Sequence, residues 1–190
     1  ITSYPAPETE YNVRCVDTMR RVFGLPTGIS DHSLDPVLVP VLTTAMGGVM
    51  IEKHITLSRA TDGLDDPVAL EAEQFAQMVQ AVRQTQAVMR RCGKDGCPQA
   101  ALPEILRQMA DQYGTETVEA ALGSGIKRLA ESERANYGRT NRSLHYLRAM
   151  RAGERIGGGD VSVLRTEKVL SPGISPEYGR FVVGCVLQRD

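Results

Sequence analysis

Two histidines, His32 and His54, lie 22 residues apart, and each follows a short segment typical of a β-strand. The residues around them alternate between strand-like and helix-like patterns, as in a chain of βα units. One βα unit separates equivalent points on neighbouring parallel strands, which lie about 5 Å apart. The spacing therefore predicts two imidazoles at one mouth of a sheet or barrel, close enough to share a metal ion.

The composition is that of an ordinary globular protein. The 190 residues suffice for one domain, or for one domain with a small appendage, and hydrophobic residues make up 42% of them. A net charge of −1 gives no electrostatic reason to expect nucleic acid or an anionic membrane as partner. No apolar run is long enough for a membrane span and the first residues show no signal peptide, so we expect a cytoplasmic location.

The first part of the chain carries the βα pattern. Apolar spacing predicts a helix over 10–24 and a strand over 27–30. Asp35-Pro36 is typical of a helix start and predicts a helix over 37–46. The first residues already resemble the end of a strand, which predicts a chain that begins in the middle of a domain.

Residues 49–57 form the clearest strand pattern in the chain. Side chains alternate between the two faces of a strand, so its polar and apolar residues separate. The polar face should point into a site and the apolar face should pack on helices. The polar face holds Met50, Glu52, His54 and Thr56; the apolar face holds Val49, Ile51 and Ile55.

The rest of the chain divides into a helical and a β-rich part. Asp66-Pro67 predicts the start of a long helix that ends near Arg91, with Asp66 as its N-cap, and residues 93–135 look mostly helical. Breaks are expected at Pro103, Gly114 and residues 123–125. From about residue 141 the pattern changes, and 161–169 and 181–187 are β-rich. We therefore expect an α/β fold, either a barrel or a doubly wound sheet, followed by a small β domain.

Cysteine and glycine patterns add little chemistry. Cys92 and Cys97 resemble half of a zinc knuckle, but there is no second ligand pair, so reduced thiols are expected. Gly157-Gly158-Gly159 lacks the strand–loop–helix context of a phosphate-binding loop and predicts a flexible turn.

The histidine pair is the strongest candidate site. Each histidine has an acidic residue within two positions upstream, Asp31 or Glu52. Two imidazoles leave several positions of a divalent ion open for substrate oxygens, which suits polarisation of a carbonyl. Glu52 shares a face with His54 and could orient a ligand or move a proton. The alternative is that Glu52 pairs with a cation inside a barrel.

Three other polar side chains lie near the expected strand ends. Asp65 is the acidic-loop residue free to face a substrate, while the spacing of the loop does not match an EF-hand. Tyr4 could donate to a ligand or only cover a barrel rim. Ser30 shares the face of His32 and could donate to a phosphate.

Taken in order, these motifs resemble the N-acetylneuraminate (sialic acid) synthase family, in a divergent spore-coat polysaccharide branch. The ordered set covers nearly the whole chain, although it corresponds only to the later half of family members. The matching segments are TSYPAP (2–7), GISDHS (28–33), IEKHITL (51–57), DGLD (62–65), NRSL (141–144) and GISP (173–176).

The resemblance implies a fold. Family members are (β/α)8 TIM barrels followed by a small antifreeze-like (SAF) domain. Residues 1–138 would be the C-terminal part of the barrel, and 139–190 the linker and the start of the SAF domain. The family works as a domain-swapped homodimer.

The resemblance also implies an activity. Family members condense phosphoenolpyruvate with an N-acetylmannosamine-type aldose and release phosphate, forming a nonulosonic acid. The residues matching His32 and His54 hold a divalent metal, commonly manganese. By carry-over Ser30 contacts the phosphate, Tyr4 and Asp65 contact the sugar, and Glu52 and Asp65 are the expected catalytic side chains. Such products enter surface or spore-coat polysaccharides.

Several departures from the family pattern bear on the acceptor. Thr2 stands where asparagine is common, and Leu64-Asp65-Asp66 replaces the usual Pro-Asp-His. Residues 168–171 read Lys-Val-Leu-Ser instead of Lys-Arg-Pro-Gly, so Val169 replaces an arginine that reaches the acceptor's N-acetyl group. The stretch 93–125 resembles an insertion. The earlier strands supply further substrate and metal contacts in the family, so this chain alone is expected to be incomplete as an enzyme.

Two alternatives stay open. A non-catalytic relative could bind a sugar or a partner after losing the acceptor site. A two-histidine metal hydrolase on the same barrel would normally need further histidines, and the third one here, His145, lies in the linker to the second domain.

Overall fold

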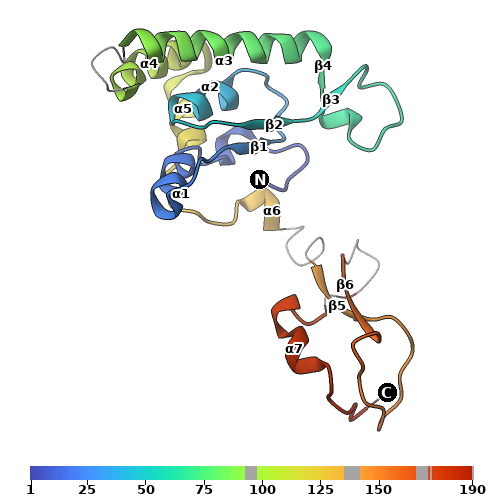
Figure 1. Cartoon of the computed structure of the whole chain (residues 1–190). Coiled ribbons are helices and arrows are strands. Elements are labelled where there is room, and N and C mark those ends of the chain that lie inside the picture. Colours follow the sequence, from blue (N-terminus) through green and yellow to red (C-terminus); the bar gives the residue numbers. More distant parts are fainter. Residues whose placement is uncertain (93–97, 135–141, 166–170, 172, 190) are drawn as a thin grey trace. The chain divides into compact units, whose positions relative to one another are not determined.

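The computed structural model describes residues 1–92, 98–134, 142–165, 171 and 173–189 (Figure 1). The chain divides into two compact units, residues 1–133 and 134–190, and each is described by itself. The expected domain boundary at 138/139, Cys97, Asn141 and Val169 lie outside the described residues. No helix in the described ranges is both long and apolar enough to cross a bilayer.

Unit 1 is a mixture of helices and short strands, consistent with the expected α/β class. Its strands form two separate pairs, β1 with β2 and β3 with β4, and both pairs are parallel. In chain order the elements are η1 (Glu8–Glu10), α1 (Cys15–Phe23), β1 (Ile29–Asp31), α2 (Leu38–Ala45), β2 (Ile51–Lys53), β3 (Ile55–Thr56), η2 (Asp66–Val68), β4 (Leu70–Glu71), α3 (Ala72–Cys92), η4 (Pro98–Ala101), α4 (Leu102–Tyr113), α5 (Thr115–Leu122) and α6 (Glu131–Arg134).

The segment β1–α2–β2 is a parallel βαβ unit. Its helix α2 is buried at every position from Leu38 to Thr44, so it forms the centre of the unit's core. Oδ1 of Asp35 accepts hydrogen bonds from the N–H groups of Val37 and Leu38, at 2.8 and 2.7 Å, which confirms the expected helix-start role of Asp35. The helix therefore begins where the sequence places it, and the strands on either side lie next to each other (Figure 1).

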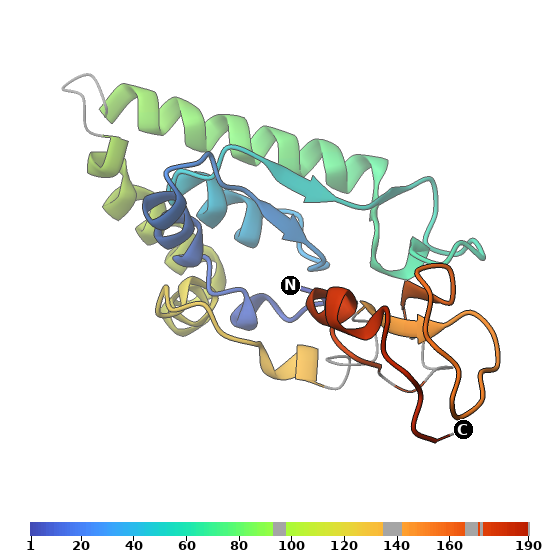
Figure 2. The ribbon, with the colours of Figure 1, turned by 60° about the horizontal axis from the view of Figure 1, so that its bottom comes forward.

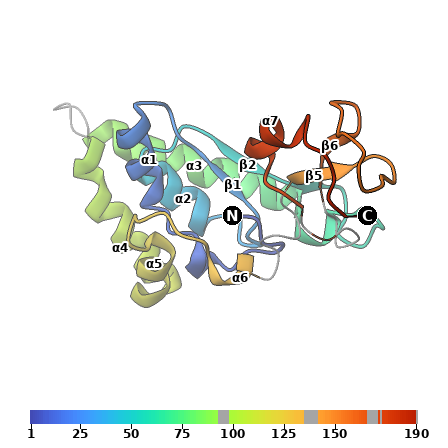
Figure 3. The ribbon, with the colours of Figure 1, turned by 90° about the horizontal axis from the view of Figure 1, so that it is seen from below.

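The helices of unit 1 enclose one apolar core. The long helix α3 covers one side of the unit (Figure 2), and α4 and α5 lie next to α2 (Figure 3). The segment 98–122, which lies within the stretch expected to be an insertion, therefore contributes to the core. Buried core residues from these helices are Val16, Leu38, Val39, Val41, Leu42, Ile105, Met109, Val118, Ala121 and Leu122.

The expected strand over 49–57 is interrupted. It is divided into β2 and β3, because β2 pairs with β1 while β3 pairs with β4, and His54 lies between the two pieces. The expectation that its apolar face packs on helices is wrong for Val49 and Ile55, which are 69% and 59% exposed. The buried side chain on that face is Lys53.

Two helix boundaries differ from the sequence expectation. The first helix begins at Cys15 instead of residue 10, because Asn12 has a left-handed backbone (φ 53°) that no α-helix accommodates. The long helix begins at Ala72, since Asp66 and Pro67 form a 3-10 turn and Leu70–Glu71 pairs as a strand. The break expected at Pro103 lies just before it, since η4 ends at Ala101 and α4 begins at Leu102, with the proline in the first turn. Gly24 and Gly114 end helices as expected.

Unit 2 contains a small antiparallel β structure. Strands β5 (Arg142–Tyr146) and β6 (Val161–Arg165) pair along their whole length. The expected strand at 181–187 is wrong for its first part, because η5 (Pro176–Tyr178) leads directly into helix α7 (Gly179–Val182). Gly157 donates its N–H to the Asp160 carboxylate at 2.8 Å, so the glycine run forms a turn.

Candidate active site at the ends of two parallel strands

The register of β1 and β2 places the two histidines opposite each other. Ser30 is opposite Glu52 and Asp31 is opposite Lys53, an offset of 22 residues that equals the spacing of His32 and His54. The centroids of the two imidazole rings are 5.3 Å apart. The prediction that one βα unit brings the rings together is therefore confirmed.

His32 is held in one orientation from several sides. Its Nδ1 lies 2.8 Å from the carbonyl oxygen of Ile1, which can only accept, so Nδ1 carries the proton and Nε2 keeps its lone pair. Its backbone N–H donates to the Tyr11 hydroxyl at 2.7 Å, and the Tyr4 ring stacks on it at 4.0 Å. Burial lowers the pKa of His32 below its ordinary value of 6.5, helped by the nearby His54, which favours the neutral form.

His54 lies at the break between β2 and β3. Its carbonyl oxygen accepts a hydrogen bond from Leu70 N–H at 3.0 Å, which starts the pairing with β4. Its Nδ1 is 3.7 Å from Oδ2 of Asp65, and the edge of the Tyr4 ring faces it at 5.7 Å. The Nδ1 side of His54 thus faces the acidic loop, although 3.7 Å is too long for a direct hydrogen bond.

Ser30 and Glu52 form the next cross-strand pair. The Ser30 hydroxyl donates to Oε1 of Glu52 at 2.9 Å, and its oxygen lies 3.4 Å from Nε2 of His32. Because the hydroxyl proton is used by Glu52, the lone pair of Nε2 stays available. Four of the expected site residues, the two histidines with Ser30 and Glu52, therefore share one face of the strand pair, and Tyr4 covers the His32 ring.

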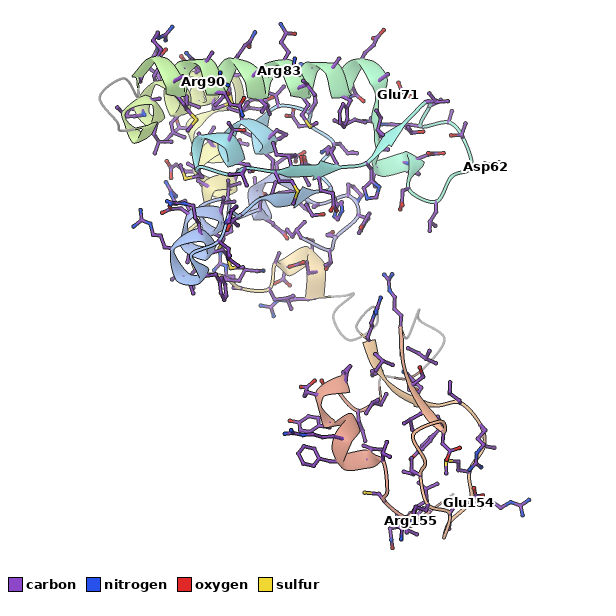
Figure 4. All side chains as sticks on the ribbon, viewed as in Figure 1. Asp62, Glu71, Arg83, Arg90, Glu154 and Arg155 are labelled. Atoms are coloured by element: carbon purple, nitrogen blue, oxygen red, sulfur yellow. The ribbon has the colours of Figure 1, made fainter. Side chains whose placement is uncertain are left out.

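The acidic loop presents only one of its carboxylates to this site. Asp65 is about half exposed beside His54. Asp66 is not the N-cap of α3; its carboxylate accepts from Gly63 N–H at 2.9 Å and from the Thr61 hydroxyl. The hydrogen bond from Thr61 is the main cause that lowers the pKa of Asp66. Asp62 lies at the outer bend of the loop (Figure 4).

Sequence reasoning missed the support behind the site. Lys53 and Asp31 form an ion pair with N···O 2.9 Å, and their side chains are only 1% and 0% exposed. The signal available was a lysine on the face that should be apolar. The Tyr11 hydroxyl, next to Asp31, has its pKa raised by burial and by that carboxylate. Nothing in the sequence around Tyr11 indicates this role.

The two imidazoles fit a divalent ion as two of its ligands. A metal–nitrogen bond of about 2.0–2.1 Å allows one ion to reach two nitrogens whose rings are this close. Nδ1 of His32 is hydrogen-bonded to the Ile1 carbonyl, which leaves Nε2 of His32 as a donor to a metal, and Nδ1 of His54 faces Asp65. Among the described residues no group of three or more histidine, cysteine or carboxylate side chains is gathered around one point. The remaining ligands would be substrate or water oxygens.

Comparisons with known proteins agree with this picture. Residues 1–94 match the NeuB family. The protein MJ1065 of Methanocaldococcus jannaschii is 28% identical over 190 residues, which is 100% of this chain and 45% of the relative. The N,N'-diacetyllegionaminic acid synthase of Legionella pneumophila is 27% identical over 189 residues, 100% of this chain and 42% of that protein. The chain thus spans less than half the length of these relatives.

A solved structure shows the same fold. The crystal structure of the spore coat polysaccharide biosynthesis protein SpsE of Bacillus subtilis matches with a TM-score of 0.76 and 25% identity. The match covers 100% of this chain and 48% of that one.

The fold and the site define an α/β protein with a histidine pair at the ends of two parallel strands. Residues 1–94 match the NeuB family, and the whole chain is similar to proteins named as sialic-acid-type synthases. The resemblance inferred from the sequence motifs is thereby confirmed.

Proposed function

We propose that this chain forms the metal-binding part of a synthase that condenses phosphoenolpyruvate with an N-acetylmannosamine-like aldose. The observation that carries the proposal is the histidine pair, whose rings lie 5.3 Å apart with each Nδ1 atom facing an oxygen atom. A divalent ion, expected to be Mn2+, would polarise the aldehyde of the open-chain sugar. His32 and His54 would hold it.

The neighbouring side chains suit the two substrates. In the reaction C3 of phosphoenolpyruvate bonds to the aldehyde carbon, a water oxygen adds at C2, and phosphate leaves with its bridging oxygen. The Ser30 hydroxyl can turn from Glu52 and donate to the phosphate. Tyr4 and Asp65, on either side of the histidines, are placed to contact hydroxyl groups of the sugar.

Glu52 is the side chain best placed to move a proton. Its carboxylate is exposed on the site face and hydrogen-bonded to Ser30. A carboxylate in this place can take the proton of an attacking water or hold it for the alkoxide that forms on the sugar. Glu52 therefore acts with Ser30 as a unit that touches both substrates.

The larger assembly is part of the same proposal. Unit 1 would belong to a (β/α)8 TIM barrel, and unit 2 would be part of an SAF domain in a domain-swapped cytoplasmic homodimer. The parallel β1–α2–β2 unit supports the first assignment, and the antiparallel β5–β6 pair is compatible with the second. The nonulosonic acid product would serve surface or spore-coat polysaccharide synthesis.

The test is phosphate release from phosphoenolpyruvate by the full-length protein with Mn2+ and a panel of N-acetylated and plain aldoses. His32→Ala and His54→Ala should abolish release, whereas His145→Ala, the matched control in unit 2, should retain it. Release that requires one aldose would identify the acceptor. No release with any aldose from protein that binds Mn2+ would contradict the synthase and favour a non-catalytic sugar-binding relative.

A further inference from the structure

The Lys53 ammonium is enclosed by partners from the other strand. It lies 2.9 Å from Oδ2 of Asp31 and 3.2 Å from Oγ of Ser33, and it also donates to the Ser33 carbonyl oxygen. An ammonium has three donors, so all three are used. Oδ1 of Asp31 accepts from Ser33 N–H at 2.8 Å, which completes the network.

The partners of Lys53 flank His32 along the chain. Asp31 precedes His32 and Ser33 follows it, and one ammonium binds both. Asp31 is fully buried and Ser33 is equally buried, with 0% exposure each, so the network lies inside unit 1. The backbone on both sides of His32 is therefore attached to a single point on β2.

The network also lies between two cross-strand pairs. Ser30 and Glu52 come before it in the register, and His32 and His54 come after it. Side chains alternate along a strand, so Lys53 and Asp31 occupy the rear of the strand pair while the site residues occupy the front. Lys53 can thus control the separation of the imidazoles without contacting a substrate.

The energetics argue for a role other than simple cohesion. Removing two charges from water costs free energy that their mutual attraction often does not recover. Replacing a buried ion pair by apolar residues of similar volume therefore often leaves the stability of a protein unchanged or raises it. An apolar pair would also join the strands, but it would not attach both neighbours of His32. Conformational specificity is a property that a buried ion pair can supply and an apolar pair cannot.

We propose that Lys53 is a positioning residue, which holds Asp31 and Ser33 from behind and thereby fixes the His32 imidazole opposite His54. The inference rests on the proposed use of the two histidines as one site. It concerns geometry and does not require turnover.

The test uses the double variant Asp31→Asn/Lys53→Met in the full-length protein. It removes both charges together, so no unpaired charge stays buried, and the amide keeps an acceptor for Ser33 N–H. Thr85→Val is the matched control: it removes a buried hydroxyl contact on α3, where Thr85 donates to Ala81 at 2.9 Å, and touches neither strand.

The first readout is the 15N NMR spectrum of labelled histidines, and the second is Mn2+ affinity. The double variant should still unfold cooperatively, but His32 should lose its single Nδ1–H tautomer, and Mn2+ affinity should fall about 10–100-fold, as for other outer-shell changes. The control should keep both. Should the double variant itself fail to fold, the same 15N spectra are recorded on Lys53→Arg, which keeps the charge with a different donor geometry. The inference is then tested by whether His32 loses its single tautomer in that variant.

Wild-type histidine signals in a folded double variant, or in Lys53→Arg should that be the deciding variant, would overturn the inference. If the wild-type protein binds no Mn2+, the metal in the proposed function fails, but the histidine spectra still decide the role of Lys53. The two failures are therefore distinguishable.

Discussion

Thr2, near the first residue of unit 1, binds the carboxylate of Glu133, the last residue of that unit. The backbone N–H and the hydroxyl of Thr2 both donate to Oε1 of Glu133, at 2.7 and 3.0 Å, and Oε2 accepts from Ala130 N–H at 3.0 Å. Glu133 is 6% exposed. This contact anchors the segment whose Ile1 carbonyl orients His32 and whose Tyr4 ring covers it.

Glu133→Gln should destabilise unit 1 by about 1.5–3 kcal/mol, because hydrogen bonds to a charged group are lost and an amide donor replaces an acceptor. Thr2→Val removes only the hydroxyl and should cost about 1 kcal/mol. Urea unfolding at neutral pH measures both. Equal costs for the two variants would show that the charge of Glu133 contributes nothing.

The same contact predicts a pH dependence. Burial raises the pKa of Glu133, but the hydrogen bonds from Ala130 and Thr2 outweigh it and hold the pKa below its ordinary value of 4.5. The unfolded carboxylate thus takes up its proton first, so this stabilisation is present above pH 4.5 and is lost as the pH falls through the folded-state pKa. Urea midpoints measured across this range should fall more steeply for wild type than for Glu133→Gln. Parallel curves would contradict the prediction.

Tyr4 should contribute its ring and its hydroxyl separately. Tyr4→Phe keeps the stack on His32 and should raise the KM for the aldose about 2–10-fold, the effect of one lost hydrogen bond, with the KM for phosphoenolpyruvate unchanged. Tyr4→Leu also removes the stack on His32 and should lower the free energy of unfolding by about 0.5–1.5 kcal/mol relative to Tyr4→Phe. Steady-state kinetics and thermal unfolding test the two effects. A Phe variant that changes both KM values equally would argue against a sugar contact.

Metal binding should persist in mildly acidic solution. Burial lowers the pKa of His32 below 6.5, so its neutral, metal-binding form persists at a pH where a free imidazole is half protonated. The stability of the fold should change in the same direction. The contribution of neutral His32 to the free energy of unfolding is present above pH 6.5 and is lost as the pH falls through the folded-state pKa. Mn2+ titrations between about pH 5 and pH 8 test this. A loss of affinity centred at or above pH 6.5 would exclude it.

Thr43 offers a test of core packing that does not involve the site. Its Oγ1 is buried and has no hydrogen-bond partner within the described part of the chain. Thr43→Val should therefore leave stability unchanged or raise it by about 1 kcal/mol, because an unsatisfied hydroxyl is replaced by a methyl group of similar size. The neighbouring Thr44 donates to the Pro40 carbonyl at 2.9 Å, so Thr44→Val should lose about 1 kcal/mol. Chemical denaturation of both variants makes the comparison.

Much of the candidate site could be predicted because it depends on local pattern and parallel-strand register. The spacing of His32 and His54 equals one βα unit, and strands in register convert that spacing into proximity. The alternation of side chains likewise placed Ser30 and Glu52 on the site face. The Asp35 helix start was also visible, since a cap acts over only a few residues.

The interruption at His54 was not predictable from its own segment. Residues 49–57 have a continuous strand pattern, but a strand needs a partner, and β2 and β3 find different ones. The same reason explains Leu70–Glu71, which pairs with β3 although it lies within an apparent helix start. Phe181 is part of a helix despite its β-rich neighbours, because propensity over a few residues is weak against tertiary context.

The sequence by itself determined the alternation of elements, the family resemblance and the residues that line the site. The tertiary structure alone decided what holds them: Lys53 with Asp31 behind the strands, and Glu133 with Thr2 in the segment that carries Tyr4. These contacts join residues 22 and 131 positions apart. Local periodicity carries no information over such separations, because burial and pairing are settled only when the whole core packs.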